Sequence, residues 1–253
     1  IPLLNMSIPI YNSLGDMKNV AANYHTLADI YDKIRVSGNE RQYSMFYQVG
    51  FYGSQWGTEL SGQQFIYKTP KLFKLFKMTE RLKKTYINAE IITSSTDKST
   101  LDDSKRYIQV TGVKPVIDRT CRSSKFEESL NLTQFYFENA FAKNKKVSAA
   151  GPSEIFKRRV VFTVGGSFPN VVSRLPIVKE EESILTPIEA AIDNIQNQIH
   201  KLEQVLEASF TDAQELQLIL QGSVRAGVNG GPQDIVTTFL DENNRSQFNA
   251  RHV

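Results

Sequence analysis

The sequence predicts an α+β fold in which an antiparallel β-sheet lobe is followed by an α-helical bundle lobe. From Gln42 to about Val178, short aromatic and β-branched runs alternate with clusters of Gly, Pro, Asn or Ser, a pattern typical of strands joined by turns. After Thr186, apolar residues instead recur at gaps of three and four, which is the period of an amphipathic helix. These two sequence patterns divide most of the chain into a strand-rich region and a helical region, and a shorter helical segment precedes both.

The first segment predicts a single helix that ends at Ser37-Gly38-Asn39. Its apolar stripe consists of Val20, Tyr24, Leu27, Tyr31 and Ile34. In the middle region we expect strands at residues 47–53, 64–67, 90–92, 107–113, 133–137 and 160–164. One helix interrupts these strands and carries Phe73, Phe76, Leu82 and Tyr86. Val164-Gly165-Gly166-Ser167 predicts a turn.

The third region opens with a helix start signal, Thr186-Pro187-Ile188-Glu189, which offers an N-cap, a proline at the first helical position and a capping-box glutamate. We interpret the preceding run, Glu180-Glu181-Glu182, as a solvated segment that favours the N-terminus of this helix. A second helix starts at Thr211 and buries Leu216, Ile219 and Leu220. Because short connections make such helices antiparallel neighbours, the region predicts a bundle.

A glycine-rich segment, residues 221–232, interrupts or follows the second helix. It carries Val224 and Val228 with little side-chain bulk around them, and an apolar helical pattern resumes at Ile235. Two readings are open. The valines fold back onto the core in an ordinary helix–helix loop, or they protrude into the cleft of another molecule.

Composition excludes several protein classes. Thirty basic and 27 acidic residues give a net charge of +3, which is too small to indicate nucleic-acid binding. The single cysteine, Cys121, excludes an internal disulfide framework and suits a reducing compartment. The sequence contains no signal peptide and no apolar run of about 20 residues, so we expect a cytoplasmic protein without a transmembrane segment. A start in an apolar segment without methionine indicates a fragment.

No arrangement of residues predicts an enzyme active site, a metal site or a cofactor. Gly222 and Gly227 have the spacing of a phosphate-binding loop, but Val228 and Asn229 stand where lysine and a hydroxyl residue are needed. The three histidines have no neighbours at metal-ligand spacing. Cys121 lies in a basic run but lacks a histidine partner motif. Lys157-Arg158-Arg159 is open to two readings, a solvated face or a site for the carboxylates of a partner protein.

Eight segments in order resemble the second Dock-homology region of the DOCK family, a guanine-nucleotide exchange module for Rho-family GTPases. They are Ile8-Pro9-Ile10 with Gly15-Asp16-Met17; residues 47–53; residues 65–68; residues 107–111; residues 156–160; Ser167-Phe168-Pro169; Thr186-Pro187-Ile188-Glu189; and residues 220–224 followed by 228–232. The resemblance favours the zizimin and Zir-like branches. It implies that residues 1–40 are the helical tail of a first lobe, residues 41–180 a β-sheet second lobe, and residues 181–253 a helical-bundle third lobe.

The resemblance also implies residue roles. In the family, a loop in a third-lobe helix points a valine at the nucleotide site of the GTPase, and Val228 matches that sensor. The residues matching the rest of the sensor loop are Val224, Gly222, Asn229, Gly230, Gly231 and Pro232. The expected partner-binding residues are Phe51, Arg158, Phe168, Pro169 and Gln221. The expected partner is a Rac-like or related GTPase, and the full-length protein is expected to dimerise through its first lobe.

Two departures from the family pattern keep an alternative open. Arg225-Ala226-Gly227 differs from the usual residues of the insert, and residues 243–253 are polar and too short to replace the further bundle helices of the family. The alternative is a noncatalytic module that binds a GTPase or a scaffold without releasing nucleotide.

Overall fold

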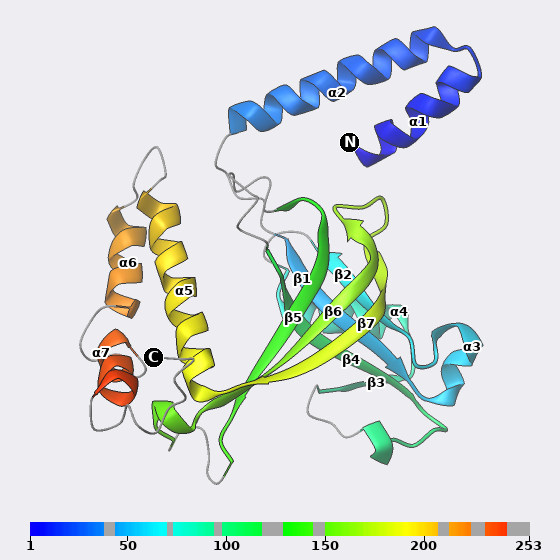
Figure 1. Ribbon diagram of the computed structural model, residues 1–253. Helices are drawn as coiled ribbons and strands as arrows, with labels where there is room; N and C mark the ends of the chain where they lie inside the picture. Colours follow the sequence, from blue (N-terminus) through cyan, green and yellow to red (C-terminus); the bar gives the residue numbers. More distant parts are fainter. Residues whose placement is uncertain are drawn as a thin grey trace. The chain divides into compact units, whose positions relative to one another are not determined.

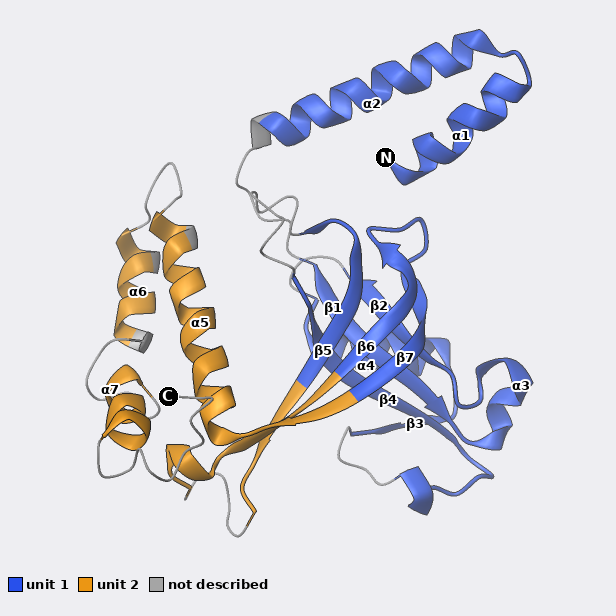
Figure 2. Ribbon diagram, in the orientation of Figure 1, with its two compact units in different colours: residues 1–137, 161–181 blue, residues 138–160, 182–253 orange. Residues whose placement is uncertain are grey.

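The computed structural model describes residues 1–37, 44–69, 73–93, 98–117, 129–143, 150–206, 213–223 and 231–241. The chain divides into two compact units. Unit 1 comprises residues 1–137 and 161–181, and unit 2 comprises residues 138–160 and 182–253 (Figure 2).

Unit 1 begins with two helices, α1 (Pro2–Ser13) and α2 (Met17–Ser37), so the predicted helix is confirmed and a helix precedes it. Gly15 has φ +70° in the turn between them, a conformation that favours glycine. Asp16 accepts a hydrogen bond from the Asn19 backbone N–H at 3.1 Å, which caps the start of α2. The Asn23 side chain donates to Ser7 Oγ at 2.8 Å and joins the two helices.

Seven strands form one sheet: β1 (Met45–Tyr52), β2 (Gln64–Thr69), β3 (Ala89–Ile92), β4 (Arg106–Pro115), β5 (Leu132–Phe141), β6 (Phe156–Phe168) and β7 (Arg174–Leu185). Their order is β1-β2-β7-β6-β5-β4-β3. An additional antiparallel pairing between β1 and β4, from Phe46 opposite Val113 to Tyr52 opposite Tyr107, closes six of the strands into a barrel (Figure 1).

The sheet corrects the sequence predictions at three places. Strand β3 pairs parallel with β4, from Ala89 opposite Arg106 to Ile92 opposite Gln109, so the sheet is not purely antiparallel. The expected turn at 164–167 is part of β6, where Gly166 adopts φ +144° and Gly165 has no side chain to clash with Val178. The acidic run 180–182, interpreted as a helix approach, lies in β7.

Two apolar clusters hold the barrel together. Phe46 of β1, Phe135 of β5 and Phe168 of β6 have ring centroids 4.8–5.9 Å apart. Strands β1 and β6 are not neighbours in the sheet, so the contact between Phe46 and Phe168 crosses the barrel interior. On the outer face, the alternate β1 residues, including Val49 and Phe51, pack with Trp56 and with Met78 and Leu82 of α4 (Leu75–Thr85).

Short helical turns complete the described connections. They are η1 (Ser54–Trp56), α3 (Gly57–Leu60), η2 (Lys98–Thr100) and η5 (Pro152–Glu154).

Unit 2 contains α5 (Pro187–Leu206), α6 (Ala213–Ser223), α7 (Pro232–Ile235) and the π-helical turn η6 (Val236–Leu240). The capping box is confirmed, because the Thr186 backbone N–H and hydroxyl both donate to Glu189 Oε2 at 2.8 Å. Helix α6 returns alongside α5 (Figure 1). Within the described residues these helices form a pair with a short third helix against it, and the complete bundle stays a prediction, as do the three lobe boundaries.

Candidate functional site

The two ends of the glycine-rich segment lie on helices of unit 2. Gln221 and Gly222 belong to the last turn of α6, and the Gln221 side chain is exposed. The helix therefore extends further than the start of the predicted loop. Val224, Val228, Asn229 and Gly230 lie outside the described residues, so their expected roles stay predictions.

The chain that leaves this segment is held firmly. Gly231 is buried and precedes α7 as its N-cap residue, and Pro232 occupies the first helical position, where no backbone N–H is needed. The Ile235 N–H donates to the Gly231 carbonyl at 3.0 Å. Ile235 and Phe239, 9% and 2% exposed, pack with Ile188 at the start of α5. The apolar contacts thus fix the exit of the loop on α5.

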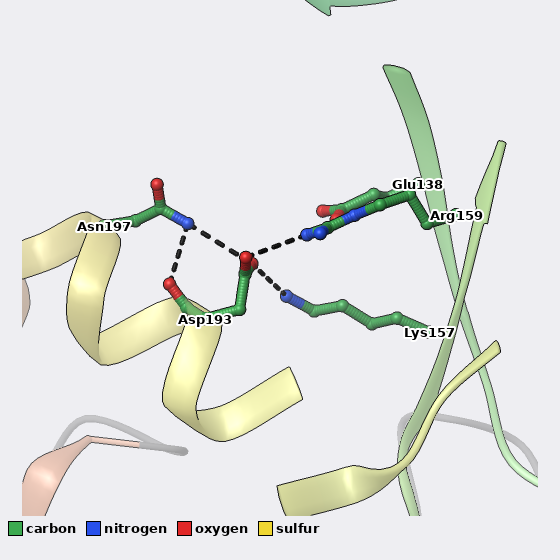
Figure 3. A network of polar contacts seen from close by, with 5 residues as sticks. All are labelled: Glu138, Lys157, Arg159, Asp193 and Asn197. Atoms are coloured by element: carbon green, nitrogen blue, oxygen red, sulfur yellow. Dashed lines mark hydrogen bonds and ion pairs between the residues drawn. The ribbon is translucent and has the colours of Figure 1, made fainter. Parts of the chain in front are cut away.

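The opposite side of α5 carries a polar network that joins the helix to β5 and β6, all within unit 2 (Figure 3). Arg159 Nη2 lies 2.9 Å from Asp193 Oδ1, and the same guanidinium contacts Glu138, with its Nε 2.6 Å from Oε1. Lys157 Nζ lies 3.9 Å from Asp193 Oδ2. Asn197 Nδ2 donates to Asp193 twice, to Oδ2 at 3.2 Å and to the backbone carbonyl at 2.7 Å.

The four charged side chains of this network are two cations and two carboxylates, each only 21–25% exposed. Burial lowers the pKa of the Arg159 guanidinium, but its hydrogen bonds with Asp193 and Glu138 outweigh that cost and leave the pKa raised. Arg159 therefore stays charged across the whole working range of pH. A charged, two-armed guanidinium between two carboxylates fixes direction as well as distance.

The basic run Lys157-Arg158-Arg159 has split roles in the structure. Successive strand residues point to opposite faces, so Lys157 and Arg159 share the face toward α5, whereas Arg158 points the other way. Arg158 Nη2 lies 2.5 Å from Glu182 Oε2 on β7, and its side chain is 56% exposed. Each of the three basic residues thus has an acidic partner in unit 2, and the expected partner-binding role of Arg158 stays a prediction.

The structure places two expected partner-binding residues in the core of unit 1. Phe51 and Phe168 are both 0% exposed. Phe51 packs edge-on against Trp56, Phe65 and Tyr86, and Phe168 packs across the barrel interior. Neither ring has surface left for a partner protein, so we assign both to the core. Pro169, which follows Phe168 through a cis peptide bond, is exposed.

Glu138, Asp193 and Asn197 were not among the site residues predicted from the sequence. One signal for them exists, because Asp193 and Asn197 are four residues apart and therefore share a face of α5. That signal indicates a polar face but not which strand it meets.

In the described part of the chain, no cluster of three or more His, Cys, Asp or Glu side chains is arranged to hold a metal ion. Cys121 lies outside the described residues. None of the helices in the described ranges has the length and apolar character needed to cross a membrane.

Comparison with known proteins adds two family matches. Residues 93–167 match the family described as DHR-2, Lobe B, and residues 190–253 match DHR-2, Lobe C. Together the two matches cover more than half of the chain. The second match includes α6, α7 and the glycine-rich segment between them.

Several curated proteins are similar over nearly the whole chain. Dedicator of cytokinesis protein 6 of Mus musculus is 35% identical and dedicator of cytokinesis protein 8 of Homo sapiens 33% identical, each over 93% of this chain and 12% of the relative. Dedicator of cytokinesis protein 11 of Danio rerio is 33% identical over 98% of this chain and 13% of the relative. The chain thus spans about an eighth of the length of these relatives.

Proposed function

Because the chain belongs to the dedicator of cytokinesis (DOCK) family, with matches to lobes B and C of its DHR-2 region, we propose that it is a guanine-nucleotide exchange module for a Rho-family GTPase. The observation that carries the proposal is the pair of lobe matches in sequence order, with the glycine-rich segment inside the second match. We propose a Rac-like GTPase as the partner and small-GTPase signalling to the cytoskeleton, in the cytoplasm, as the setting.

The proposed mechanism is displacement of the magnesium ion that holds GDP in the GTPase. A bound guanine nucleotide is held through its phosphates and through Mg²⁺, which requires oxygen ligands. The methyl groups of Val228 offer no oxygen and exclude water from the metal site. Magnesium is thereby disfavoured, and the affinity for diphosphate falls with it. Incoming GTP with magnesium then competes with the valine and releases the exchange factor, because the coupling is reciprocal.

The packing at the ends of the segment supports this mechanism. To displace a bound metal ion with a small side chain, a loop must be anchored firmly at both of its ends. Gly231 is buried, and Ile235 and Phe239 pack against Ile188. Glycines next to the valine leave room for close approach to the GTPase. The proposed action needs no nucleophile, acid, base or cofactor from this chain, so we propose an exchange factor rather than an enzyme with covalent chemistry.

The test is release of fluorescent GDP from a panel of Rho-family GTPases, with a Rac-like member included, in the presence and absence of the chain. We expect the chain to accelerate release from at least one GTPase, and excess GTP with Mg²⁺ to dissociate the complex. The absence of both binding and release across the panel would overturn the proposal.

Binding without release would support the alternative, a noncatalytic GTPase-binding or scaffold module. The observation that favours this alternative is Arg225-Ala226-Gly227, which departs from the family pattern beside the sensor valine. An added glycine makes the loop more flexible, so the loop holds Val228 less firmly in the metal site of the GTPase.

A further inference from the structure

We propose that the contact between Arg159 and Asp193 is a positioning device for the sensor loop. The expected effect on nucleotide exchange rests on the proposed function, whereas the contact and its effect on α5 concern unit 2 alone. Neither residue is expected to touch the GTPase nucleotide. Their role is to hold α5 in one rotation against β5 and β6, and through α5 to hold both ends of the loop.

The first step is the two-sided character of α5. Ile188, Ala191 and Ile195 form the face that packs with Ile235 and Phe239. Asp193 follows Ile188 by five positions, which rotates its side chain by about 140° around the helix axis. Asp193 and Asn197 therefore lie on the face opposite the apolar one, where Figure 3 shows them directed toward the strands. One helix thus has the strands on one side and α7 with η6 on the other.

The second step is that both ends of the loop depend on α5. Its entry is the last turn of α6, which runs alongside α5 (Figure 1). Its exit is α7, which is packed on the first two turns of α5 through Ile188. A rotation of α5 would carry the exit of the loop with it, because Ile235 and Phe239 are almost completely buried against that helix.

The third step is that the polar side of α5 makes directional contacts, which can set the rotation of the helix. Apolar contacts are non-directional, so the cluster around Ile188 tolerates a small turn of the helix. The Arg159 guanidinium is directional, because its Nε and Nη2 both meet Glu138 while the same Nη2 also meets Asp193. Asn197 and Lys157 bind the same carboxylate and hold it in the orientation that Arg159 requires. Asp193 is therefore the point at which the strands determine the angle of α5.

The test uses Asp193→Asn, which keeps the shape and removes the charge. The matched control is Glu203→Gln, the same chemical change on the same helix at an exposed carboxylate that pairs with His200 at 3.8 Å. In the chain alone, hydrogen exchange of the amides of residues 235–240 is expected to accelerate roughly three- to tenfold in Asp193→Asn. The amides of α1 and α2 should not change, and the control should match the wild type.

The functional arm measures exchange kinetics on the GTPase that the wild type activates best. For Asp193→Asn we expect kcat to fall roughly three- to tenfold with little change in the KM for the GTPase, because docking is retained and loop placement is lost. Unchanged amide protection and unchanged kcat in Asp193→Asn would overturn the positioning role. A rise in KM at constant kcat would also overturn it, since that result indicates a docking residue.

Failure of the proposed function is distinguishable from failure of this inference. If the wild type activates no GTPase but the amides of residues 235–240 lose protection in Asp193→Asn, the device stands and the exchange function fails. Should Asp193→Asn not fold, Arg159→Lys takes its place, because it retains the charge and loses the two-armed contact. That variant is expected to show a smaller loss of protection, and protection equal to the wild type would count against the proposal.

Discussion

Phe239 of η6 and Ile188 of α5 lie in one buried cluster, although they are 51 positions apart in the chain. Phe239 is 2% exposed and Ile188 is 7% exposed. The contact bridges the whole segment that contains α6 and the glycine-rich residues, so it closes a long loop and fixes the place where the chain re-enters helical structure.

Phe239→Ala should therefore destabilise unit 2. Removing a buried phenylalanine side chain leaves a cavity and costs about 3–5 kcal/mol. We expect urea unfolding followed by circular dichroism to show a lower midpoint, together with weaker nucleotide exchange. Leu240→Ala is the matched control, because Leu240 is 54% exposed and its loss should change stability by less than about 0.5 kcal/mol. Equal stability of the two variants would show that the cluster contributes nothing.

Val228→Ala should slow nucleotide release roughly tenfold or more while GTPase binding is retained. In the proposed mechanism the valine methyl groups displace magnesium and do not contribute to docking. Fluorescent-nucleotide release and a binding titration measure the two effects separately. Val178→Ala removes the same atoms from an exposed side chain and should behave like the wild type. Near-normal acceleration by Val228→Ala would make the sensor assignment wrong.

Arg158→Glu should weaken GTPase binding roughly tenfold, because the family resemblance implies that Arg158 lies on the partner-binding surface and a guanidinium there can pair with a carboxylate of the partner. The change also places a second carboxylate beside Glu182, 2.5 Å from the present guanidinium. The control is Lys179→Glu, an equal charge reversal at an exposed ion pair with Glu181. Binding affinity is read by titration at two salt concentrations. Identical affinities for wild type and Arg158→Glu would remove Arg158 from the partner surface.

Gly53→Ala should destabilise the fold by about 2–4 kcal/mol, because two costs combine. Gly53 has φ +103°, and an added Cβ would lie 2.0 Å from the Lys105 carbonyl oxygen. Gly112→Ala is the control, since the nearest atom to its Cβ is in the Tyr47 ring at 3.9 Å. We expect Gly112→Ala to be neutral or slightly stabilising in thermal unfolding. A similar loss of stability in both variants would contradict the steric argument.

The strands show how far local pattern carries a prediction. Strands β1 and β4 are rich in aromatic and β-branched residues, and both were predicted close to their observed bounds. Strand β7 was missed because it contains the run Lys179-Glu180-Glu181-Glu182, whose side chains are exposed. Charged residues can occupy a strand when neither face is buried at that point, and no periodicity then marks them.

The candidate site shows a different limit. The aromatic residues of β1 predict a strand, but the elements that pack against β1 decide whether each ring is buried or exposed. Phe51 faces Trp56 and α4, and so lies in the core rather than on a partner surface. Likewise, Lys157-Arg158-Arg159 predicts a charged strand end, whereas the sorting of its residues between Asp193 and Glu182 depends on the packing of α5 and the pairing of β7.

The amino-acid sequence alone determined the features that depend on neighbours along the chain: the capping box at Thr186, the amphipathic period of α5, the pattern of most strands, and the ordered segments that resemble the DOCK family. The tertiary structure decided the closure of the barrel through β1 and β4, the burial of Phe51, and the meeting of Arg159 with Asp193. The reason is physical, because propensity and capping act within a few residues. The β1–β4 and Arg159–Asp193 contacts instead join residues 34 to 67 positions apart and form only when whole elements pack.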